Sequence, residues 1–549
     1  MEHDDEAQVR RGHRRRDTAS SLIRHGLLSD GSAGLKAVSL IIGILVVSPL
    51  VWLVVRASEV EYSRAVDLVL SASTLGVFLN SIGLVFGVTV LSVLIGVPAA
   101  FLTVRTDVPF RRLWTVVLSL PLVVPSYIGA FAFVSASSPR GFFGWIPTPY
   151  GFVGAVVVLT LYTYPYVYIT TRASLKSFDT SLVDAARTLN ASKWEAFRKV
   201  TVPHILPAVG AGSLLVALYA LSDFGTPAIM RFDSFTRVIY NEYNAMGRNF
   251  AALLSVQLLL VTFVILGAES YLSAKSGSGS GGNARGAGAG AGGKKKTRLV
   301  SLGVWRLPAA AACGSVGLVA LGLPIGILVS WLLRDSPSYA SSLAFEASYA
   351  FNSVYVSLGA ALVAGVAAVP VAYLSARDDS RLSSLIERST YIGYATPGIV
   401  VGLALVYLGV LYLRPLYQTV PLLVFAYVVR FLPQSVGSTR SSVLQVNSSL
   451  PEAARSLGRS KLGAFLSVTL PLIAPGVLGG AALVFLTTMK ELPATLMLRP
   501  TGFKTLATHI WTVQVQGYYG YAAVSALILV LISGVSMIVM ISQEGYDVE

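Results

Sequence analysis

Residues that support covalent or metal chemistry are scarce in this chain of 549 residues. The single cysteine, Cys313, leaves no partner for an intrachain disulfide and no CxxC metal or redox motif. The five histidines include no pair at a metal-ligand spacing such as HExxH, so no constellation supports a membrane enzyme. Charged residues make up 13% of the chain, far fewer than a soluble protein of this length needs to cover its cores. A soluble globular fold is therefore excluded.

Long apolar runs are what the chain has instead. Hydrophobic residues make up 54% of it, and runs of about 18 residues or more, long enough to cross a bilayer, recur throughout. An isolated apolar segment satisfies its backbone hydrogen bonds in lipid only as a helix, so an all-α polytopic membrane protein is predicted. The first 36 residues are polar and the first apolar run is long enough to stay as an anchor, so no cleavable signal peptide is expected. Twelve transmembrane helices are expected, at 37–55, 77–103, 113–136, 151–171, 205–222, 251–272, 309–333, 351–375, 389–413, 419–437, 473–489 and 521–542.

The formal net charge of +15 follows the topology of these helices. With the amino terminus in the cytoplasm, 31 of the 42 Lys and Arg residues fall on the inner segments, Arg430 among them, which leaves 11 outside. Positive charge is retained on the cytoplasmic face, so both termini are predicted to be cytoplasmic, in a plasma or inner membrane. No nucleic-acid partner is needed to explain the charge.

A Gly/Ser/Lys-rich stretch separates two hydrophobic halves. We expect it to be a flexible cytoplasmic linker, because it has no apolar period. A phosphate-binding loop fails here, since Lys295 stands where Ser or Thr should hold magnesium and no strand precedes it. The predicted domains are a basic tail (1–36), a first half of six helices (37–272), the linker (273–308), a second half of six helices (309–542) and a short tail (543–549).

The two halves repeat each other in sequence. Early in each half, equivalent residues differ by 272 in residue number, so that Asn80 corresponds to Asn352. Later they differ by 268, so that Pro203 corresponds to Pro471. Each half has an even number of helices, so the two lie parallel, related by an axis along the membrane normal. A pathway at that axis favours a transporter or channel over an enzyme.

The most polar part of the repeat lies between the fourth and fifth helix of each half. It reads "DAARTLNASKWEAFRKVTVPHILP" from Asp184 and "EAARSLGRSKLGAFLSVTLPLIAP" from Glu452. The acid suits the amino end of a short helix, which Ser181 is expected to cap in the first copy. Asn190 and Gly458 tolerate the left-handed conformation that ends a helix. The alternative, an interfacial helix that only joins two spans, is less favoured because the segment occurs twice.

This pattern resembles the cytoplasmic loop of the membrane subunits of ABC importers. The resemblance implies the type I ABC importer permease fold and coupling helices that dock on separate ATPase subunits. The matching residues are Asp184, Ala185, Ala186 and Asn190 in the first loop and Glu452, Ala453, Ala454 and Gly458 in the second. The first loop departs from the family pattern with Asp for Glu and Asn for Gly.

The resemblance also implies partners. Two copies of an ATPase subunit would hold ATP and Mg²⁺, and an extracytoplasmic binding protein would deliver the substrate. We therefore expect this chain to be no enzyme and to bind no cofactor of its own.

Two further stretches resemble ferric-iron importer permeases: "TMKELPATLMLRPTGFKTLATHIW" from Thr488 and "ALSDFGTPAIMR" from Ala220. Similar permeases serve thiamine, phosphonate or polyamine, so these solutes stay open. A different class, an ion-coupled secondary transporter, also uses parallel halves of six helices. It predicts buried ionisable residues within the spans, of which the sequence shows few.

Asp223 and Glu491 occupy equivalent positions at the outer ends of two helices and are candidates for the substrate pathway. A carboxylate at such depth is costly unless it is wet, paired or faces a cavity. Two of them near the axis would attract a hard cation such as Fe³⁺. The alternatives are that both lie in water, or that Glu491 pairs with Lys490. No resident metal site is assigned.

Overall fold

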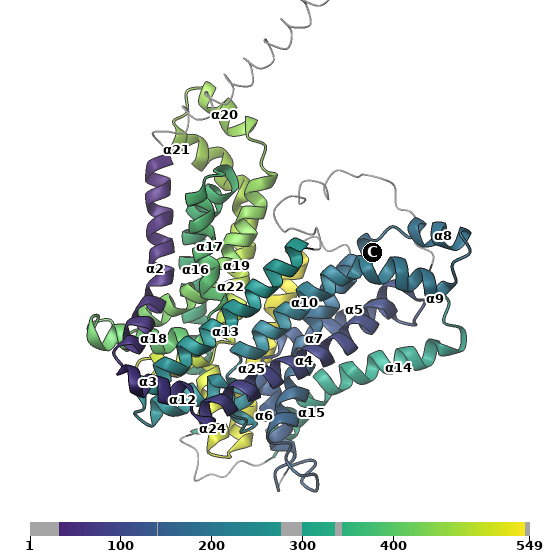
Figure 1. The fold of residues 1–549 in the computed structure, drawn as a ribbon, viewed down its shortest axis with the longest axis horizontal. Coiled ribbons are helices and arrows are strands. Elements are labelled where there is room, and N and C mark those ends of the chain that lie inside the picture. The colour runs from purple at the N-terminus through teal and green to yellow at the C-terminus, as the bar shows by residue number, and fades with distance from the viewer. Residues whose placement is uncertain (1–31, 140, 276–298, 335–342, 544–549) are drawn as a thin grey trace, which may run out of the picture. The chain divides into compact units, whose positions relative to one another are not determined.

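The computed structural model describes residues 32–139, 141–275, 299–334 and 343–543, and these are almost entirely helical (Figure 1). They form two compact units that cut across the sequence halves. Unit 1 comprises Met1–Ser48, Ala360–Tyr394 and Phe431–Val484, and unit 2 comprises Pro49–Gly359, Ala395–Arg430 and Phe485–Glu549. The expected tails and most of the linker (1–31, 276–298 and 544–549) lie outside the described residues.

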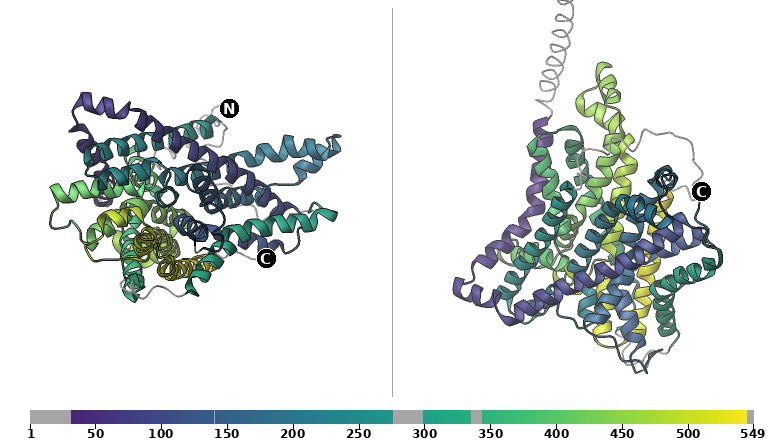
Figure 2. Two further views of the ribbon diagram at one scale, coloured as in Figure 1. Left: turned by 90° about the horizontal axis from the view of Figure 1, so that it is seen from below. Right: turned by 45° about the vertical axis from the view of Figure 1, so that its right-hand side comes forward.

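Unit 2 holds most of the helices. In chain order they are α3 (Tyr62–Val69), α4 (Ala72–Arg105), α5 (Arg111–Ser119), α6 (Ser126–Ala136), α7 (Phe152–Ser177), α8 (Ser181–Thr188), α9 (Lys193–Ala196), α10 (Val202–Ser222), α11 (Gly225–Ile229), α12 (Phe235–Asn244), α13 (Arg248–Lys275), α14 (Arg306–Gly317), α15 (Leu323–Leu332), α18 (Gly398–Leu411), α23 (Pro493–Leu498), α24 (Leu506–Val515) and α25 (Tyr519–Gln543). Figure 2 shows them from two further sides.

Unit 1 holds the short helices α20 (Ser449–Ser456) and α21 (Lys461–Ala464). Five longer helices have residues in both units: α2 (Ser32–Ser58), α16 (Ala347–Arg377), α17 (Arg381–Ala395), α19 (Val420–Gln445) and α22 (Leu470–Met489).

The described helices confirm the predicted spans. Ten are long and apolar enough to cross a membrane, and two bent pairs bring the number to as many as twelve, at the positions expected from the apolar runs. The first pair, Arg111–Val123 and Ser126–Ala136, bends by 91°. The bends fall at Pro125 and Pro397, each in an extended conformation directly before the second helix of its pair. A proline supplies no backbone N–H and restricts the residue before it, so it ends the first helix.

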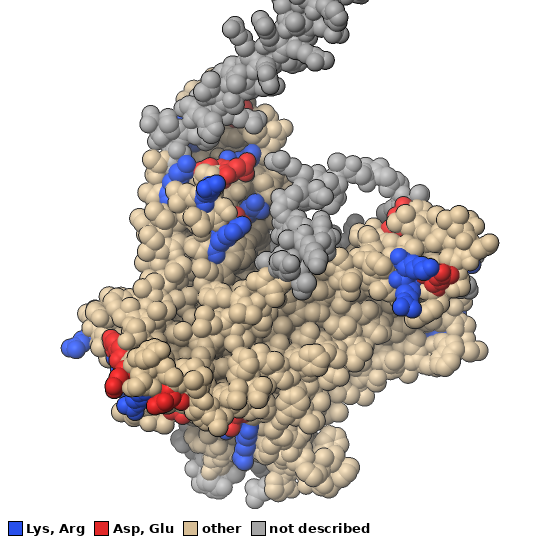
Figure 3. Space-filling view, viewed as in Figure 1, with Lys and Arg blue, Asp and Glu red and all other residues tan. Residues whose placement is uncertain are grey.

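Charge is distributed as a bilayer requires. Figure 3 shows that charged side chains on the visible face of unit 2 gather over α8 and α9 at one end and around α3 and α12 at the other. The surface over α10 and α13, between these ends, is nearly free of them. Transfer of a charged group into hydrocarbon is costly, so this uncharged belt marks the part of unit 2 that faces lipid.

The repeat is visible in contacts that recur at the same offsets. Arg105 donates from Nη2 to the carbonyl oxygens of Leu175 (2.8 Å) and Phe178 (3.2 Å) in unit 2. Its counterpart Arg377 donates to the equivalent carbonyls, of Val446 (2.8 Å) and Val443 (3.4 Å), in unit 1. Arg105 anchors the end of α4 to the end of α7, and Arg377 anchors the end of α16 to the end of α19. The two equivalent contacts confirm the repeat.

A second repeated contact lets helices approach closely. A Cβ on Gly212 would lie 2.7 Å from the Cα of Val167, and one on Gly480 would lie 2.7 Å from the Cα of Ser435. Both pairs have the offset of 268. Only a residue without a side chain permits this distance, as is typical of helix crossings in membranes.

The described end of the linker is fixed to the first half. Val300 donates its N–H to the Arg105 carbonyl (2.8 Å), and Leu302 donates its N–H to the Asp107 carboxylate (2.9 Å). Arg306 completes the contact as an ion pair with Asp107 at 2.8 Å. The backbone N–H of Leu302, with help from Arg306, holds the pKa of Asp107 below its usual value. Composition alone predicted flexibility here, and for residues 299–306 the structure shows a fixed segment.

Candidate coupling loops and a buried polar cluster

The first predicted coupling loop contains helix α8 and a left-handed end. Asn190 has φ +64°, and its N–H donates to the Arg187 carbonyl (3.2 Å), while the N–H of Ala191 donates to the Ala186 carbonyl (3.2 Å). These two bonds are those of a Schellman motif, which satisfies carbonyls that the helix end leaves unpaired. The Asn190 conformation was predicted from its residue type alone.

The second predicted coupling loop repeats this geometry in unit 1. Gly458 has φ +89°, and its N–H donates to the Arg455 carbonyl at 3.0 Å. The N–H of Arg459 donates to the Ala454 carbonyl at 3.1 Å. The substitution of Asn for Gly between the two loops therefore leaves the shape of the helix end unchanged.

The starts of the two helices also agree, although sequence reasoning chose the wrong cap. Ser181 was expected to cap α8, but its own N–H is accepted by the Asp179 side chain at 2.9 Å. In the second loop the N–H of Ser449 donates to the Asn447 side chain at 3.1 Å. Short Asx side chains hydrogen-bond readily to the backbone two residues on, so each helix begins with an Asx turn.

Each loop presents the same small and apolar surface. Asp184 and Ala185 are exposed, and so are Glu452 and Ala453, while Ala186 and Ala454 are half-buried. A leucine follows on each helix end, Leu189 being 83% exposed and Leu457 87% exposed. The exposed leucine and the exposed alanine leave each helix open to contact with another protein.

The two candidate pathway carboxylates lie together inside unit 2. Asp223 accepts a hydrogen bond from the Ser126 hydroxyl (2.8 Å) and one from the backbone N–H of Thr226 (2.9 Å). The Tyr219 hydroxyl donates to Ser126 at 3.2 Å. Asp223 and Glu491 interact electrostatically, so the structure brings the two predicted residues into one cluster.

Glu491 has a partner that sequence reasoning missed. It forms a buried ion pair with Arg430 of α19, and its other oxygen accepts the backbone N–H of Ala494 at 3.0 Å. The side chains of Arg430 and Glu491 are only 12% and 6% exposed. Neither expected alternative holds for Glu491, because it does not lie in water and Lys490 donates instead to the Leu122 carbonyl (3.1 Å).

Arg430 also corrects the charge count. It was counted among the inner loop residues, but it lies within a span and is buried, so it adds nothing to the cytoplasmic excess. The signal that could have found it is an arginine inside an apolar span, which implies a buried acidic partner.

The equivalent carboxylates Asp223 and Glu491 have different neighbours in the two halves. Ser126 stands in the first half where Gly398 stands in the second, and Tyr162 stands where Arg430 stands. A Cβ on Gly398 would lie 2.5 Å from both Arg430 Nη1 and Glu491 Oε1, so glycine leaves room for the ion pair. Asp223 is thus held by a hydroxyl and a backbone donor, whereas Glu491 is held by a cation and a backbone donor.

The cluster does not form a resident metal centre of the usual kind. Among the described residues, no group of three or more His, Cys, Asp or Glu side chains lies where it could hold a metal ion. The cluster consists of a hydrogen-bonded acid, an ion pair and the Tyr219 hydroxyl. Its chemistry suits a gate or a transient contact for a passing solute, which leaves the pathway role of Asp223 and Glu491 as a prediction.

Comparison with known proteins shows similarity over nearly the whole chain. An Fe(3+)-transport system permease protein of Haemophilus influenzae is 30% identical over 509 residues, which cover 91% of this chain and 96% of the relative. A ferric transport system permease protein of Actinobacillus pleuropneumoniae is 23% identical over 482 residues, 82% of this chain and 69% of the relative. A molybdenum transport system permease protein of Escherichia coli is 33% identical over 137 residues, 24% of this chain and 60% of the relative.

Residues 92–275 and 368–543 each match the family described as "Binding-protein-dependent transport system inner membrane component". Each match contains one coupling-loop sequence and one of the two clustered carboxylates. The chain therefore belongs to this family, as a multi-pass inner-membrane permease of a binding-protein-dependent ABC importer in which the family domain occurs twice.

Proposed function

We propose that this permease carries ferric iron into the cell and is driven by two copies of a separate ATPase subunit. The observation that carries the second part is the pair of matching loops, each with an exposed acid, an exposed alanine and a left-handed end. Two loops of one shape suit two copies of one partner. Asp184, Ala185, Ala186 and Asn190 would contact one copy, and Glu452, Ala453, Ala454 and Gly458 the other.

ATP and Mg²⁺ would be held by the partner subunits. Closure of those subunits on ATP would move α8 and α20 as rigid bodies, because each helix is locked at its end by the Schellman bonds. That motion would switch the helices between outward-open and inward-open states. This chain itself would contribute no catalytic residue.

The orientation follows from the charge bias and from the ATPase. Lys and Arg are concentrated on the side of the coupling loops, so these loops and both termini are proposed to be cytoplasmic. The opposite end of unit 2, where α10 ends at Ser222, would then face the extracytoplasmic binding protein that delivers the substrate (Figure 1).

Ferric iron is favoured because the two relatives that match along most of the chain are described as ferric-iron transport permeases. The acidic cluster adds a physical argument, since Asp223 lacks a described cationic partner and can contribute negative charge along the route of a hard cation. Thiamine, phosphonate and polyamine remain the alternative solutes.

The secondary-transporter alternative gains one observation from the structure. The buried Arg430–Glu491 pair is the kind of intramembrane ionisable group that coupled carriers use. Uptake into proteoliposomes separates the two mechanisms: an ABC importer needs ATP and the ATPase, whereas a carrier needs only an ion gradient.

The coupling loops are tested by Ala185→Trp together with Ala453→Trp. We expect the wild-type chain to co-purify with its ATPase, and the double variant to lose it while it still inserts and folds. Leu260→Trp, at an exposed position of α13 away from both loop segments, is the matched control and should leave co-purification unchanged. Retention of the ATPase by the double variant would contradict the docking role.

A further inference from the structure

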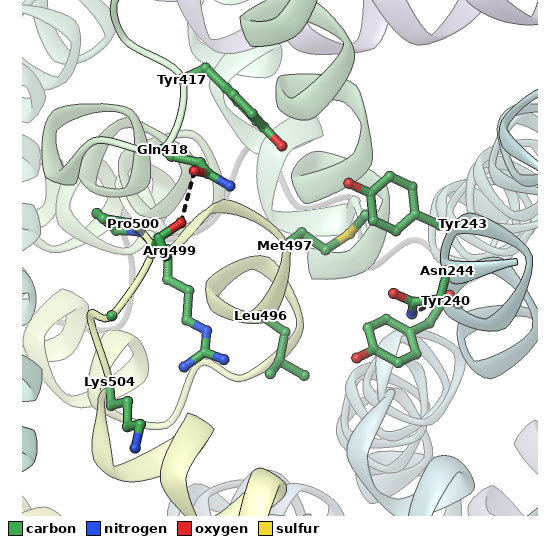
Figure 4. Close-up of a pocket in the computed structure, with 12 residues that line it drawn as sticks. Tyr240, Tyr243, Asn244, Tyr417, Gln418, Leu496, Met497, Arg499, Pro500 and Lys504 are labelled. Carbon is green, nitrogen blue, oxygen red and sulfur yellow. Dashed lines mark hydrogen bonds between the residues drawn. The ribbon is translucent and has the colours of Figure 1, made fainter. Parts of the chain in front are cut away.

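A pocket of about 380 Å³ opens in unit 2 between α12, the loop before α19 and the loop between α23 and α24 (Figure 4). Its wall includes residues of α12, a helix that Figure 1 shows at the opposite end of unit 2 from α8. Its volume suits a small polar solute. Twelve residues line it: Tyr240, Tyr243, Asn244, Tyr417, Gln418, Leu496, Met497, Arg499, Pro500, Thr501, Gly502 and Lys504.

The charge of the lining is of one sign. Arg499 and Lys504 are cationic, and none of the twelve lining residues is Asp or Glu. Figure 4 shows these two side chains on one side of the pocket, with Tyr240 and Tyr243 on the other. Phenol and amide groups complete the wall and can donate further hydrogen bonds. Such a lining favours a negatively charged group.

The donors of the two cations are only weakly engaged by the protein. In the described part of the chain, the Arg499 guanidinium has one long hydrogen bond, from Nη1 to the Phe503 carbonyl at 3.4 Å. Lys504 Nζ lies 3.3 Å from the Tyr349 hydroxyl and 5.3 Å from the centroid of the Tyr349 ring, and that hydroxyl donates to the Glu346 carboxylate at 3.0 Å. Most of the planar Arg499 fork therefore stays available to a carboxylate or phosphate, which it matches with two parallel bonds.

In the first half the loop that corresponds to this wall runs from Arg231 to Ser234, and all of its residues are described. Its counterpart of Arg499 is Arg231, whose guanidinium stacks over the Tyr150 ring at 4.4 Å. The Ser81 hydroxyl accepts the backbone N–H of Phe235, the first residue of α12. In the second half the Ser353 hydroxyl accepts the backbone N–H of Leu506, the first residue of α24.

These contacts align the two loops and show a difference in length. From the arginine to the start of the next helix there are four positions in the first half (231 to 235) and seven in the second (499 to 506). The longer loop supplies Thr501, Gly502 and Lys504 to the pocket. The longer loop of the second half thus adds a second cation, Lys504, which the loop of the first half lacks.

We propose that this pocket binds an oxyanion, a carboxylate or phosphate group, on the side of the membrane away from the coupling loops. The group would sit between the Arg499 guanidinium and the Lys504 ammonium and accept further bonds from the tyrosine hydroxyls. This inference rests on the residues that line the pocket and does not depend on which solute the permease transports.

The oxyanion can arrive in two ways. It can be a free anion, or it can be a ligand of Fe³⁺ in a chelate whose net charge is negative. A bare trivalent cation would be repelled by Arg499 and Lys504, so the pocket would select the chelate over the bare ion. The two sources share one chemistry and differ only in whether iron is present.

Titration calorimetry on the full chain in nanodiscs tests this, with inorganic phosphate, citrate and ferric citrate as separate titrants. We expect saturable binding of at least one of them. Arg499→Gln and Lys504→Gln should each weaken it about tenfold or more, because each removes a charge-assisted bond. Arg231→Gln is the matched control and should bind as the wild type does. Arg499→Lys keeps the charge and should retain part of the affinity.

Each outcome decides the proposal. Binding of phosphate or citrate that Arg499→Gln weakens supports it and assigns a free anion. Binding of ferric citrate alone, weakened in the same way, supports it and assigns the chelate. Absence of saturable binding to all three titrants overturns it, and so does equal binding by the wild type and both glutamine variants. Iron uptake measured on the same variants is a separate readout, so ferric transport can stand even if the pocket proposal fails.

Discussion

Arg430→Met should be among the most destabilising substitutions in unit 2. The change removes a cation that is 12% exposed and leaves Glu491, 6% exposed, without its counter-charge. One hydrogen bond to the carboxylate would remain, from the backbone N–H of Ala494 at 3.0 Å. Removal of one member of a buried ion pair typically costs about 3–5 kcal/mol, because the other charge stays buried and uncompensated. We therefore expect a loss of this size in the free energy of unfolding.

A second substitution separates the uncompensated charge from lost packing. Arg430→Met combined with Glu491→Gln removes both charges, and Gln can still accept the Ala494 N–H. Replacing both members of a buried pair is often nearly neutral, so most of the lost stability should return. The matched control is Arg440→Met, which breaks a pair with Glu387 (3.3 Å) that is 37% and 21% exposed and should cost about 1 kcal/mol or less.

The assay is unfolding in mixed micelles of increasing denaturing detergent, followed by circular dichroism. If Arg430→Met were no less stable than Arg440→Met, the ion pair would contribute little and the buried cluster would be misread. A double variant as unstable as Arg430→Met alone would show that packing, and not charge, is responsible.

Three further predictions follow from local geometry. Gly398→Ala should destabilise unit 2 by about 1–3 kcal/mol, since the new Cβ would lie 2.5 Å from Arg430 Nη1, and the loss should shrink in the Arg430→Met background. Gly458→Ala places a side chain at φ +89° and should weaken ATPase co-purification, whereas Asn190→Gly should leave it equal or stronger. Gly480→Val should lower thermal stability strongly because the Ser435 backbone is 2.7 Å from the Cβ position, while Gly479→Ala, with its nearest atom at 3.6 Å, should be nearly neutral.

The spans and the coupling-loop geometry followed from the sequence because both depend on local chemistry. Apolar length predicts a membrane helix wherever it occurs. The ends of α8 and α20 followed from the tolerance of Asn190 and Gly458 for positive φ. None of these depends on which helices pack together.

The buried cluster depends on contacts between distant segments and could not be derived in the same way. Arg430 and Glu491 are 61 residues apart, and no local pattern pairs them. The offset of 268 matched Tyr162 with Arg430 but did not show that a cation there faces a carboxylate. The pocket was missed for a similar reason, since its walls come from three separate segments of unit 2.

The most direct test of the account is uptake of radiolabelled ferric iron by proteoliposomes that contain this permease, its ATPase and its binding protein, with ATP enclosed. We expect uptake that requires ATP and the binding protein and that Ala185→Trp with Ala453→Trp abolishes. Iron uptake driven by an ion gradient without ATP would contradict the ABC mechanism. ATP-dependent uptake of thiamine, phosphonate or polyamine, without uptake of ferric iron, would contradict the proposal that ferric iron is the substrate.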